Sequence, residues 1–260
     1  MPTYSKVVSV IKQIDTAHVF IGGTRKDITS GWTFVNGVRK QVFPSAENYT
    51  KVYENNTPGA YSTTLSWGRY KIVLSGAGGS GGASSSAHNS YLNYANNGAP
   101  GKTFTAYIDV ASGDTRTISG IIGSGGKSCT ARGYDNGNGS YSVGAAGTGA
   151  TNGTKGTGQV VNTETTIPRI TSAAAAGGSG GGSTSAVGIG TAAGGAGGNC
   201  RALNSANRQA NGTGGAGGSG SNQGNGAAGG AGRYAWDALA TSGAGSNGYI
   251  HIYKSNIYPE

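Results

Sequence analysis

Glycine tracts that repeat with a period of three residues constrain the fold of this chain more than any other feature. Between Gly177 and Gly232, four tracts repeat Gly-Gly-X-Gly, where X is Ser or Ala, and a further copy begins at Gly78. Three residues per turn is the repeat of the left-handed polyproline-II type of helix, which has no internal hydrogen bonds. Two faces of such a helix carry no side chain here, so neighbouring helices can approach and hydrogen-bond to one another. We expect a bundle of polyglycine-II helices.

Other structures can also contain glycine-rich tracts. Flexible Gly/Ser linkers and silk-like or low-complexity disorder share this composition, and they stand as alternatives to the ordered bundle. Collagen is excluded, because six prolines and no sustained Gly-X-Y run cannot build a triple helix. Aromatic and basic residues punctuate the tracts, which favours order because a linker has no need of Tyr or Trp.

The composition sets a second constraint on the fold. The 260 residues include 52 glycines, and only 11% of residues are charged. Glycine loses the most backbone entropy on folding, so a dense network of backbone hydrogen bonds must hold the structure together. The low charge argues against ordinary disorder, which needs a high net charge to stay expanded.

The first 44 residues differ from the rest and contain a small duplication. Phe20–Ile28 aligns with Phe34–Val42 at an offset of 14 residues. Each copy holds a dipeptide that type I′ hairpin turns require, Gly22-Gly23 and Asn36-Gly37, between β-forming residues. We predict two short hairpins in residues 1–44, which are marginal alone and therefore dock on another chain or form a homo-oligomer. Residues 45–60 are polar and are interpreted as a linker.

Residues 61–254 are expected to form one glycine-rich domain with a mainly β fold and few or no α-helices. Strands are predicted over 61–75, 102–122 and 248–254, with a turn at Ser112-Gly113-Asp114. Because the last strand follows all the tracts, we expect it to close the sheet begun near residue 61. The bundle is then an insertion in a small antiparallel β-sandwich, with polyglycine-II tracts over 76–82, 144–158, 177–182, 194–198, 214–220 and 229–232.

Catalysis, cofactors and metals find no support in the sequence. No Gly-x-Ser-x-Gly elbow is present, and no glycine tract continues into the Lys and helix that a phosphate loop needs. Cys129 and Cys200 are not spaced as metal ligands are. They could form one disulfide, but we expect two free, buried thiols. We therefore expect no enzyme activity, no cofactor and no metal.

The net charge of +9 favours an anionic partner. It is not concentrated in a nucleic-acid-type stripe and RGG repeats are absent, so nucleic acid is not expected as a partner. No apolar run is long enough to insert in a membrane.

Segments between the tracts hold the residues that we expect to bind a partner. Rods would expose these segments at their ends, where binding residues usually lie. Tyr, Trp and Arg are enriched in binding hot spots, and Tyr among Asn and Ser is similar to antibody paratopes. Each of these side chains can instead pack against a neighbouring rod. The candidates are Tyr91, Tyr94, Arg201, Asn204, Arg208, Tyr234 and Trp236.

Several of these motifs together resemble a known protein family. Tyr70-Lys71-Ile72-Val73-Leu74-Ser75 runs into Gly76-Ala77-Gly78-Gly79, a later hairpin ends in Gly-Ser-Gly-Gly, and the C-terminal strand reads Tyr-Ile-His-Ile-Tyr. With the tracts, this pattern is similar to bacteriophage glycine-rich tail proteins, and the tracts of 177–232 resemble those of tail-fibre tip adhesins of T-even-type phages. Residues 1–60 do not match the fibre-attachment domain of those adhesins.

The resemblance implies a layered polyglycine-II sandwich whose variable loops contact a bacterial surface receptor, either a protein or a glycan. It implies an extracellular protein of the virion tail. Because the hairpins of residues 1–44 are marginal alone, we expect this segment to attach the protein to another virion or tail protein. A non-adhesive structural protein of the tail or capsid surface is the alternative. An ice-binding protein is a third reading, because polyglycine-II bundles can present flat faces.

Overall fold

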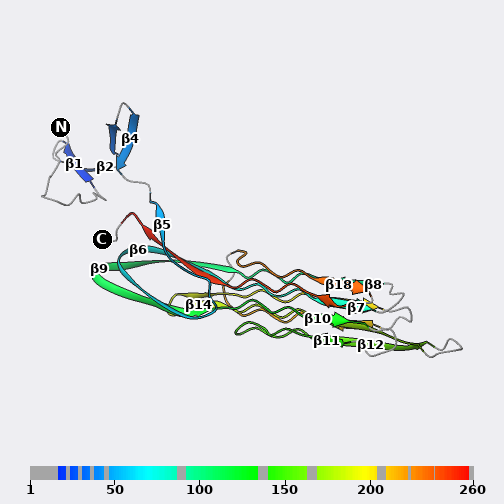
Figure 1. Ribbon diagram of the computed structural model, residues 1–260. Helices are drawn as coiled ribbons and strands as arrows, with labels where there is room; N and C mark the ends of the chain where they lie inside the picture. Colours follow the sequence, from blue (N-terminus) through cyan, green and yellow to red (C-terminus); the bar gives the residue numbers. More distant parts are fainter. Residues whose placement is uncertain are drawn as a thin grey trace.

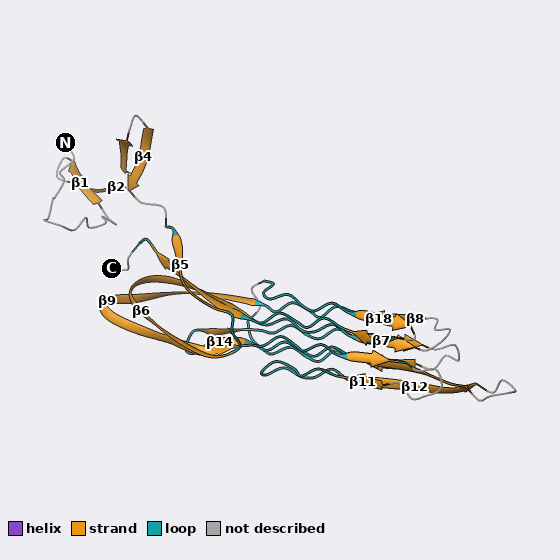
Figure 2. Cartoon of the chain, viewed as in Figure 1, coloured by secondary structure: helices purple, strands orange, loops and turns teal. Residues whose placement is uncertain are grey.

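The computed structural model of this protein contains strands and no helix within the residues that it describes (Figure 2). This confirms the expected mainly β class. No segment of the described chain forms a helix that could cross a membrane. The described residues are 17–21, 24–28, 31–35, 38–43, 47–86, 92–133, 140–162, 169–203, 209–221, 224–236 and 238–257.

Two antiparallel hairpins occur in the N-terminal segment, around the dipeptides that indicated them. Strand β1 (Ala17–Ile21) pairs with β2 (Thr24–Ile28), and β3 (Gly31–Val35) pairs with β4 (Val38–Phe43). Each register leaves two residues between the paired strands, which is the loop length that Gly-Gly and Asn-Gly favour.

A six-stranded sheet of order β15-β14-β9-β6-β20-β5 forms one end of the main body. The last strand of the chain pairs with β6, so that Tyr249 lies opposite Ser75. Part of the expected linker is itself a strand, because β5 pairs with β20 at the sheet edge. The strands are β5 (Tyr49–Asn55), β6 (Gly59–Ser75), β9 (Thr103–Ile122), β14 (Thr184–Ala186), β15 (Gly190–Ala192) and β20 (Tyr249–Ser255).

The two longest strands, β6 and β9, form a bent two-stranded ribbon (Figure 1). The predicted turn at Ser112-Gly113-Asp114 does not reverse the chain into a hairpin. Both halves of β9 pair with β6, from Gly59 opposite Ile122 to Ser75 opposite Thr103, and residues 111–114 lie outside this register. Gly113 has a φ of 86°, which bends β9 at this point.

The bend brings the two halves of the ribbon together around an apolar core. Leu65 and Ile118 come from one half, Ile72 and Val110 from the other, and the Tyr61 hydroxyl donates to the Ser185 carbonyl at 2.9 Å. The other buried members of this core are Tyr70, Leu74, Ile122, Ala186, Ala192, Ile250 and Ile252.

Glycine-rich segments, called rods below, run side by side from this sheet to short strands at the far end (Figure 1). In the rod 76–82, successive N–H groups point to three different neighbours in turn. The N–H groups of Gly76, Gly79 and Gly82 donate to the rod 96–102, those of Ala77 and Ser80 to 177–183, and those of Gly78 and Gly81 to 242–248. This period of three is that of a polyglycine-II helix.

The rods 76–82 and 177–183 occupy the two central positions of the bundle. Carbonyl groups of 76–82 accept hydrogen bonds from a second set of neighbours, 123–129, 193–199 and 226–232, so six rods surround it. The rod 177–183 is likewise bonded to 76–82, 123–129, 143–148, 151–154, 193–199 and 213–220. One central rod therefore comes from the isolated upstream copy, not from the main run of tracts.

The structure corrects the tract predicted over 144–158. Residues 143–148 and 151–154 form two separate rods, and residues 155–158 belong to strand β12. A turn joins the two rods, in which the Ala150 N–H donates to the Gly147 carbonyl at 3.0 Å. Gly149 there has a φ of 76°, which glycine adopts readily and which a straight rod cannot contain.

Beyond the rods, three small sheets stack as layers at the far end, called the tip below. The middle layer has the order β12-β13-β7-β18, and the flanking layers are β17-β16-β8 and β11-β10-β19. Ala174 and Ala176 face one flank with Cys129, while Ala175 faces the other with Cys200. The strands are β7 (Ala83–Ser86), β8 (Leu92–Ala95), β10 (Thr130–Arg132), β11 (Ser140–Ser142), β12 (Lys155–Asn162), β13 (Arg169–Ala176), β16 (Cys200–Leu203), β17 (Gln209–Gly212), β18 (Arg233–Trp236) and β19 (Ala240–Thr241).

Candidate binding surface at the tip

Strands from separate parts of the chain meet at the tip, at the opposite end of the bundle from the bend of β6 and β9 (Figure 1). Each rod on this side continues directly into a strand, as 76–82 continues into β7 and 193–199 into β16. The period-three hydrogen bonds thus fix the position of every tip strand relative to its neighbours.

Four of the predicted binding residues lie on tip strands. Tyr94 is on β8, Arg201 on β16, and Tyr234 and Trp236 on β18. The structure therefore brings together residues that are up to 142 positions apart in the sequence. The predicted residues Tyr91, Asn204 and Arg208 lie outside the described residues, as does the Trp236 side chain.

Tyr94 and Arg201 are direct cross-strand neighbours in the flanking layer β17-β16-β8. Arg201 lies opposite Asn211 on its other side, so the three residues form a row across the three strands. Their neighbours along the strands, Ala95, Cys200, Ala202 and Ala210, pack inward against the middle layer. Side chains alternate between faces along a strand, so Tyr94, Arg201 and Asn211 share the outer face.

The exposure of these side chains agrees with that arrangement. Tyr94 is 39% exposed, Asn211 is exposed and Arg201 is half-buried. Asn211 was not among the predicted binding residues. Its alternation with the buried Ala210 is the signal in the sequence that could have placed it on the outer face.

Tyr234 is the most exposed aromatic side chain in the described part of the tip, at 63%. It lies opposite Ser84 in the parallel pair of β18 and β7, at the edge of the middle layer. Its neighbour Ala235 packs against the Cys129 cluster. Because Tyr234 and Tyr94 stand on different layers, they do not share one flat face.

Positive charge dominates the described residues of the bundle and tip. The sequence holds seven basic residues between residues 123 and 248, and the structure describes the side chains of four of them, Lys127, Arg132, Arg201 and Arg233. The acidic residues of this stretch, Asp135, Glu164 and Asp237, lie outside the described residues. The described tip residues are therefore suited to an anionic partner.

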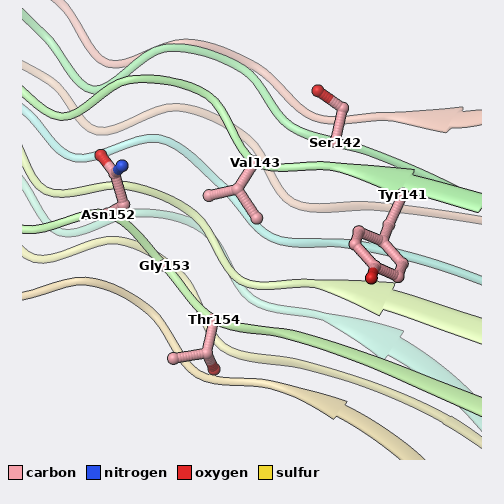
Figure 3. A pocket seen from close by; sticks show the side chains of 6 residues that line it. All are labelled: Tyr141, Ser142, Val143, Asn152, Gly153 and Thr154. Atoms are coloured by element: carbon pink, nitrogen blue, oxygen red, sulfur yellow. The ribbon is translucent and has the colours of Figure 1, made fainter.

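A groove of about 520 Å³ opens on the side of the bundle, between the rods 143–148 and 151–154 (Figure 3). Tyr141, Ser142, Val143, Asn152, Gly153 and Thr154 line it. The Asn152 side chain is committed to the fold, because its Oδ1 accepts the Ala146 N–H at 2.8 Å. The groove holds neither a nucleophile–base pair nor two carboxylates, and it contains none of the predicted binding residues.

Neither cysteine has the surroundings of a reactive thiol. Cys129 and Cys200 are both free and buried, on opposite sides of the middle layer. Burial raises the pKa of Cys200 to about 12, and burial also raises the pKa of Cys129. Both thiols stay protonated at neutral pH and act as small packing residues. No group of three His, Cys, Asp or Glu residues within the described ranges is placed to hold a metal ion.

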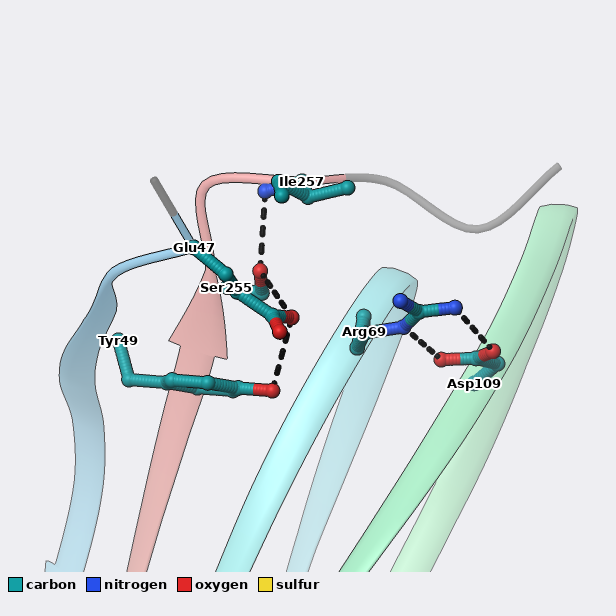
Figure 4. Close-up of polar contacts among 6 residues, drawn as sticks. All are labelled: Glu47, Tyr49, Arg69, Asp109, Ser255 and Ile257. Atoms are coloured by element: carbon teal, nitrogen blue, oxygen red, sulfur yellow. Dashed lines mark hydrogen bonds and ion pairs between the residues drawn. The ribbon is translucent and has the colours of Figure 1, made fainter. Parts of the chain in front are cut away.

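At the other end of the body, polar contacts hold the chain entering β5 against the C-terminal strand (Figure 4). The Glu47 carboxylate accepts from the Tyr49 hydroxyl at 2.8 Å and from Ser255 Oγ at 2.9 Å. Across β6 and β9, Arg69 donates to both carboxylate oxygens of Asp109, at 3.0 and 3.1 Å. The N-terminal segment therefore joins the body at the sheet end, away from the tip.

In comparisons with known proteins, the sequence matches no protein-family model and shows no significant similarity to a curated protein.

Proposed function

We propose that this protein is a bacteriophage tail or tail-fibre tip adhesin that binds a bacterial surface receptor with the tip of its rod bundle. The observation that carries the proposal is the convergence of Tyr94, Arg201 and Tyr234 on one end of the molecule. These are residue types that dominate binding hot spots, and they come from distant parts of the chain.

The rod bundle supports this function by fixing the tip before a receptor arrives. Hydrogen bonds join each central rod to six others, so the strands at the tip cannot shift independently. A surface that is ordered in advance loses less conformational entropy on binding. A bundle of this kind suits an adhesin, which must present a defined surface at a distance from its point of attachment.

The opposite end of the body supports the expected attachment to another tail protein. The N-terminal hairpins lead into β5, which lies at the edge of the sheet and pairs with β20 on one side. Attachment through residues 1–44 would leave the tip facing away from the virion. On this proposal the protein belongs to the extracellular part of the virion tail.

Binding of the fluorescently labelled protein to a panel of bacterial envelope preparations tests the proposal. We expect saturable binding to at least one envelope and loss of binding in the double variant Tyr94→Ala/Tyr234→Ala. The matched control is Tyr107→Ala, because Tyr107 is 62% exposed, as Tyr234 is, but lies on β9 at the sheet end. Equal loss in the control, or no binding to any envelope, would favour the non-adhesive structural protein of the tail.

A further inference from the structure

The outer face of the flanking layer β17-β16-β8 carries large polar side chains, unlike its inner face. Its inner face is uniform, with Ala95, Cys200, Ala202 and Ala210 packed on the middle layer. Its outer face instead places a phenol ring, a guanidinium group and an amide side by side, from Tyr94, Arg201 and Asn211. Antiparallel neighbours of this kind have Cβ atoms about 4.5–5.5 Å apart, so one small ligand can touch all three.

We propose that this row binds a sugar that carries an anionic group. The Arg201 guanidinium is a planar donor that matches a carboxylate or a phosphate with two parallel hydrogen bonds. The Tyr94 ring offers an apolar face for the C–H groups of the sugar ring, and the Asn211 amide can donate to or accept from sugar hydroxyls. The proposal rests on the adhesin function for the source of its ligand, which is a bacterial surface glycan.

The positive charge of Arg201 favours an anionic ligand over a neutral one. Between residues 123 and 248 the sequence holds seven basic residues and three acidic ones, so the bundle and tip together attract anions. Arg201 is half-buried, which reduces the solvent screening of its charge. A protein receptor would need a larger contact area than one row of three residues, and it is therefore an outcome of the test.

Titration of the full-length protein with small sugars, followed by NMR of the arginine side-chain N–H groups, tests the proposal directly. The probes are glucuronate, glucose 1-phosphate, glucose and inorganic phosphate. We expect both anionic sugars to shift the Arg201 signal saturably. Glucose alone and phosphate alone should each bind at least roughly tenfold more weakly than the anionic sugars, because each lacks one part of the interaction. A preference between the two anionic sugars identifies the ligand as a carboxylated or a phosphorylated glycan.

Two substitutions on the outer face separate a loss of binding from a loss of folding. Arg201→Gln removes the charge, whereas Asn211→Asp changes one exposed side chain to a carboxylate of the same shape that competes for Arg201. Both should weaken binding of the anionic sugars by at least about tenfold, as expected for hydrogen bonds to a charged group. Arg116→Gln, at an exposed site on β9 at the sheet end, should leave binding unchanged.

The outcomes that overturn this site differ from those that overturn the adhesin function. Equal binding of glucose and glucuronate, an Arg201 signal that does not shift, or equal loss in Arg116→Gln each excludes the proposed sugar site. If Arg201→Gln and Asn211→Asp still bind envelopes as the unmodified protein does, the receptor contacts another part of the tip and the adhesin function stands. If no envelope binds but the anionic sugars do, the adhesin function falls and the sugar site remains.

Discussion

Ser80 and Ser179 bond reciprocally at the centre of the bundle, where the two central rods meet. The Ser80 N–H donates to the Ser179 carbonyl at 2.9 Å, and the Ser179 N–H donates to Ser80 Oγ at 2.8 Å. Both residues are fully buried. A side-chain oxygen thus takes the place that a backbone carbonyl fills elsewhere in the rods, and Ser179 Oγ in turn donates to the Gly144 carbonyl.

Replacing Ser80 with Ala should destabilise the protein although it removes only one atom. The Ser179 N–H would lose its acceptor in a buried site, which costs about 1–3 kcal/mol. Urea unfolding measures the free energy of unfolding, and Ser62→Ala on the exposed side of β6 is the matched control. The control should change the free energy by less than about 0.5 kcal/mol. Equal effects of the two substitutions would contradict the role of Ser80.

Replacing Gly79 with Ala should disrupt the bundle. An added Cβ at Gly79 would lie 2.1 Å from the Ala196 carbonyl oxygen, which is backbone and cannot rotate away. We expect a loss of more than about 3 kcal/mol, beyond the usual range for overpacking. Thermal unfolding and the yield of folded protein are the measurements. The control is Ala196→Ser, whose exposed side chain can extend outward; a Gly79→Ala protein with unchanged stability would contradict the close packing of the rods.

Lowering the pH should destabilise the sheet end through His251. The imidazole stacks on Tyr249, with ring centroids 4.3 Å apart, and burial lowers its pKa below the usual 6.5, with a further contribution from Lys51. The unfolded state therefore takes up a proton before the folded state does. The contribution of His251 to the free energy of unfolding is fully present above about pH 6.5 and falls as the pH drops below that value. His251→Gln should reduce this fall, measured by urea unfolding at pH 7 and pH 5; an identical fall in both proteins would show that His251 contributes nothing.

Raising the pH should destabilise the tip through Cys200. Its pKa in the folded state is about 12 because of burial, against a usual value of 9.0. The unfolded thiol ionises first, so stability is complete below about pH 9 and declines as the pH rises toward 12. The free energy of unfolding of the Cys200→Ala protein should decline less steeply over the same pH range. A thiol reagent at pH 8 should leave the native protein unmodified and label both cysteines in denaturant; labelling of the native protein would contradict this burial.

Several features of the fold could be predicted from local patterns in the sequence. The period-three tracts indicate polyglycine-II rods, because two of the three faces of such a helix carry no side chain and can approach neighbouring rods closely enough to hydrogen-bond. The alternation of Phe104, Ile108 and Val110 indicates a strand face, and these residues do pack in or against the core. The dipeptides Gly22-Gly23 and Asn36-Gly37 indicate hairpins because they permit the turn that right-twisted strands need.

Other rods could not be recognised from composition. The rod 96–102 reads Asn-Asn-Gly-Ala-Pro-Gly-Lys, yet it bonds to the central rod along its length. In this rod, glycine occupies the positions on the face that meets the central rod. Gly98 and Gly101 supply that face, because a Cβ there would lie 2.1 and 1.9 Å from the carbonyl oxygens of Gly79 and Gly76. One glycine in three is too weak a signal to read along a sequence.

Local patterns in the sequence set the local conformations: strands where apolar residues alternate, rods where small residues repeat every third position, and tight turns where glycine permits positive φ. Three features depend instead on contacts between distant parts of the chain: which rods are central, the bend of β9 at residues 111–114, and the row of Tyr94, Arg201 and Asn211. The physical reason is that a polyglycine-II helix satisfies none of its own hydrogen bonds. Each rod is therefore specified by partners such as Ser80 and Ser179, which lie 99 residues apart.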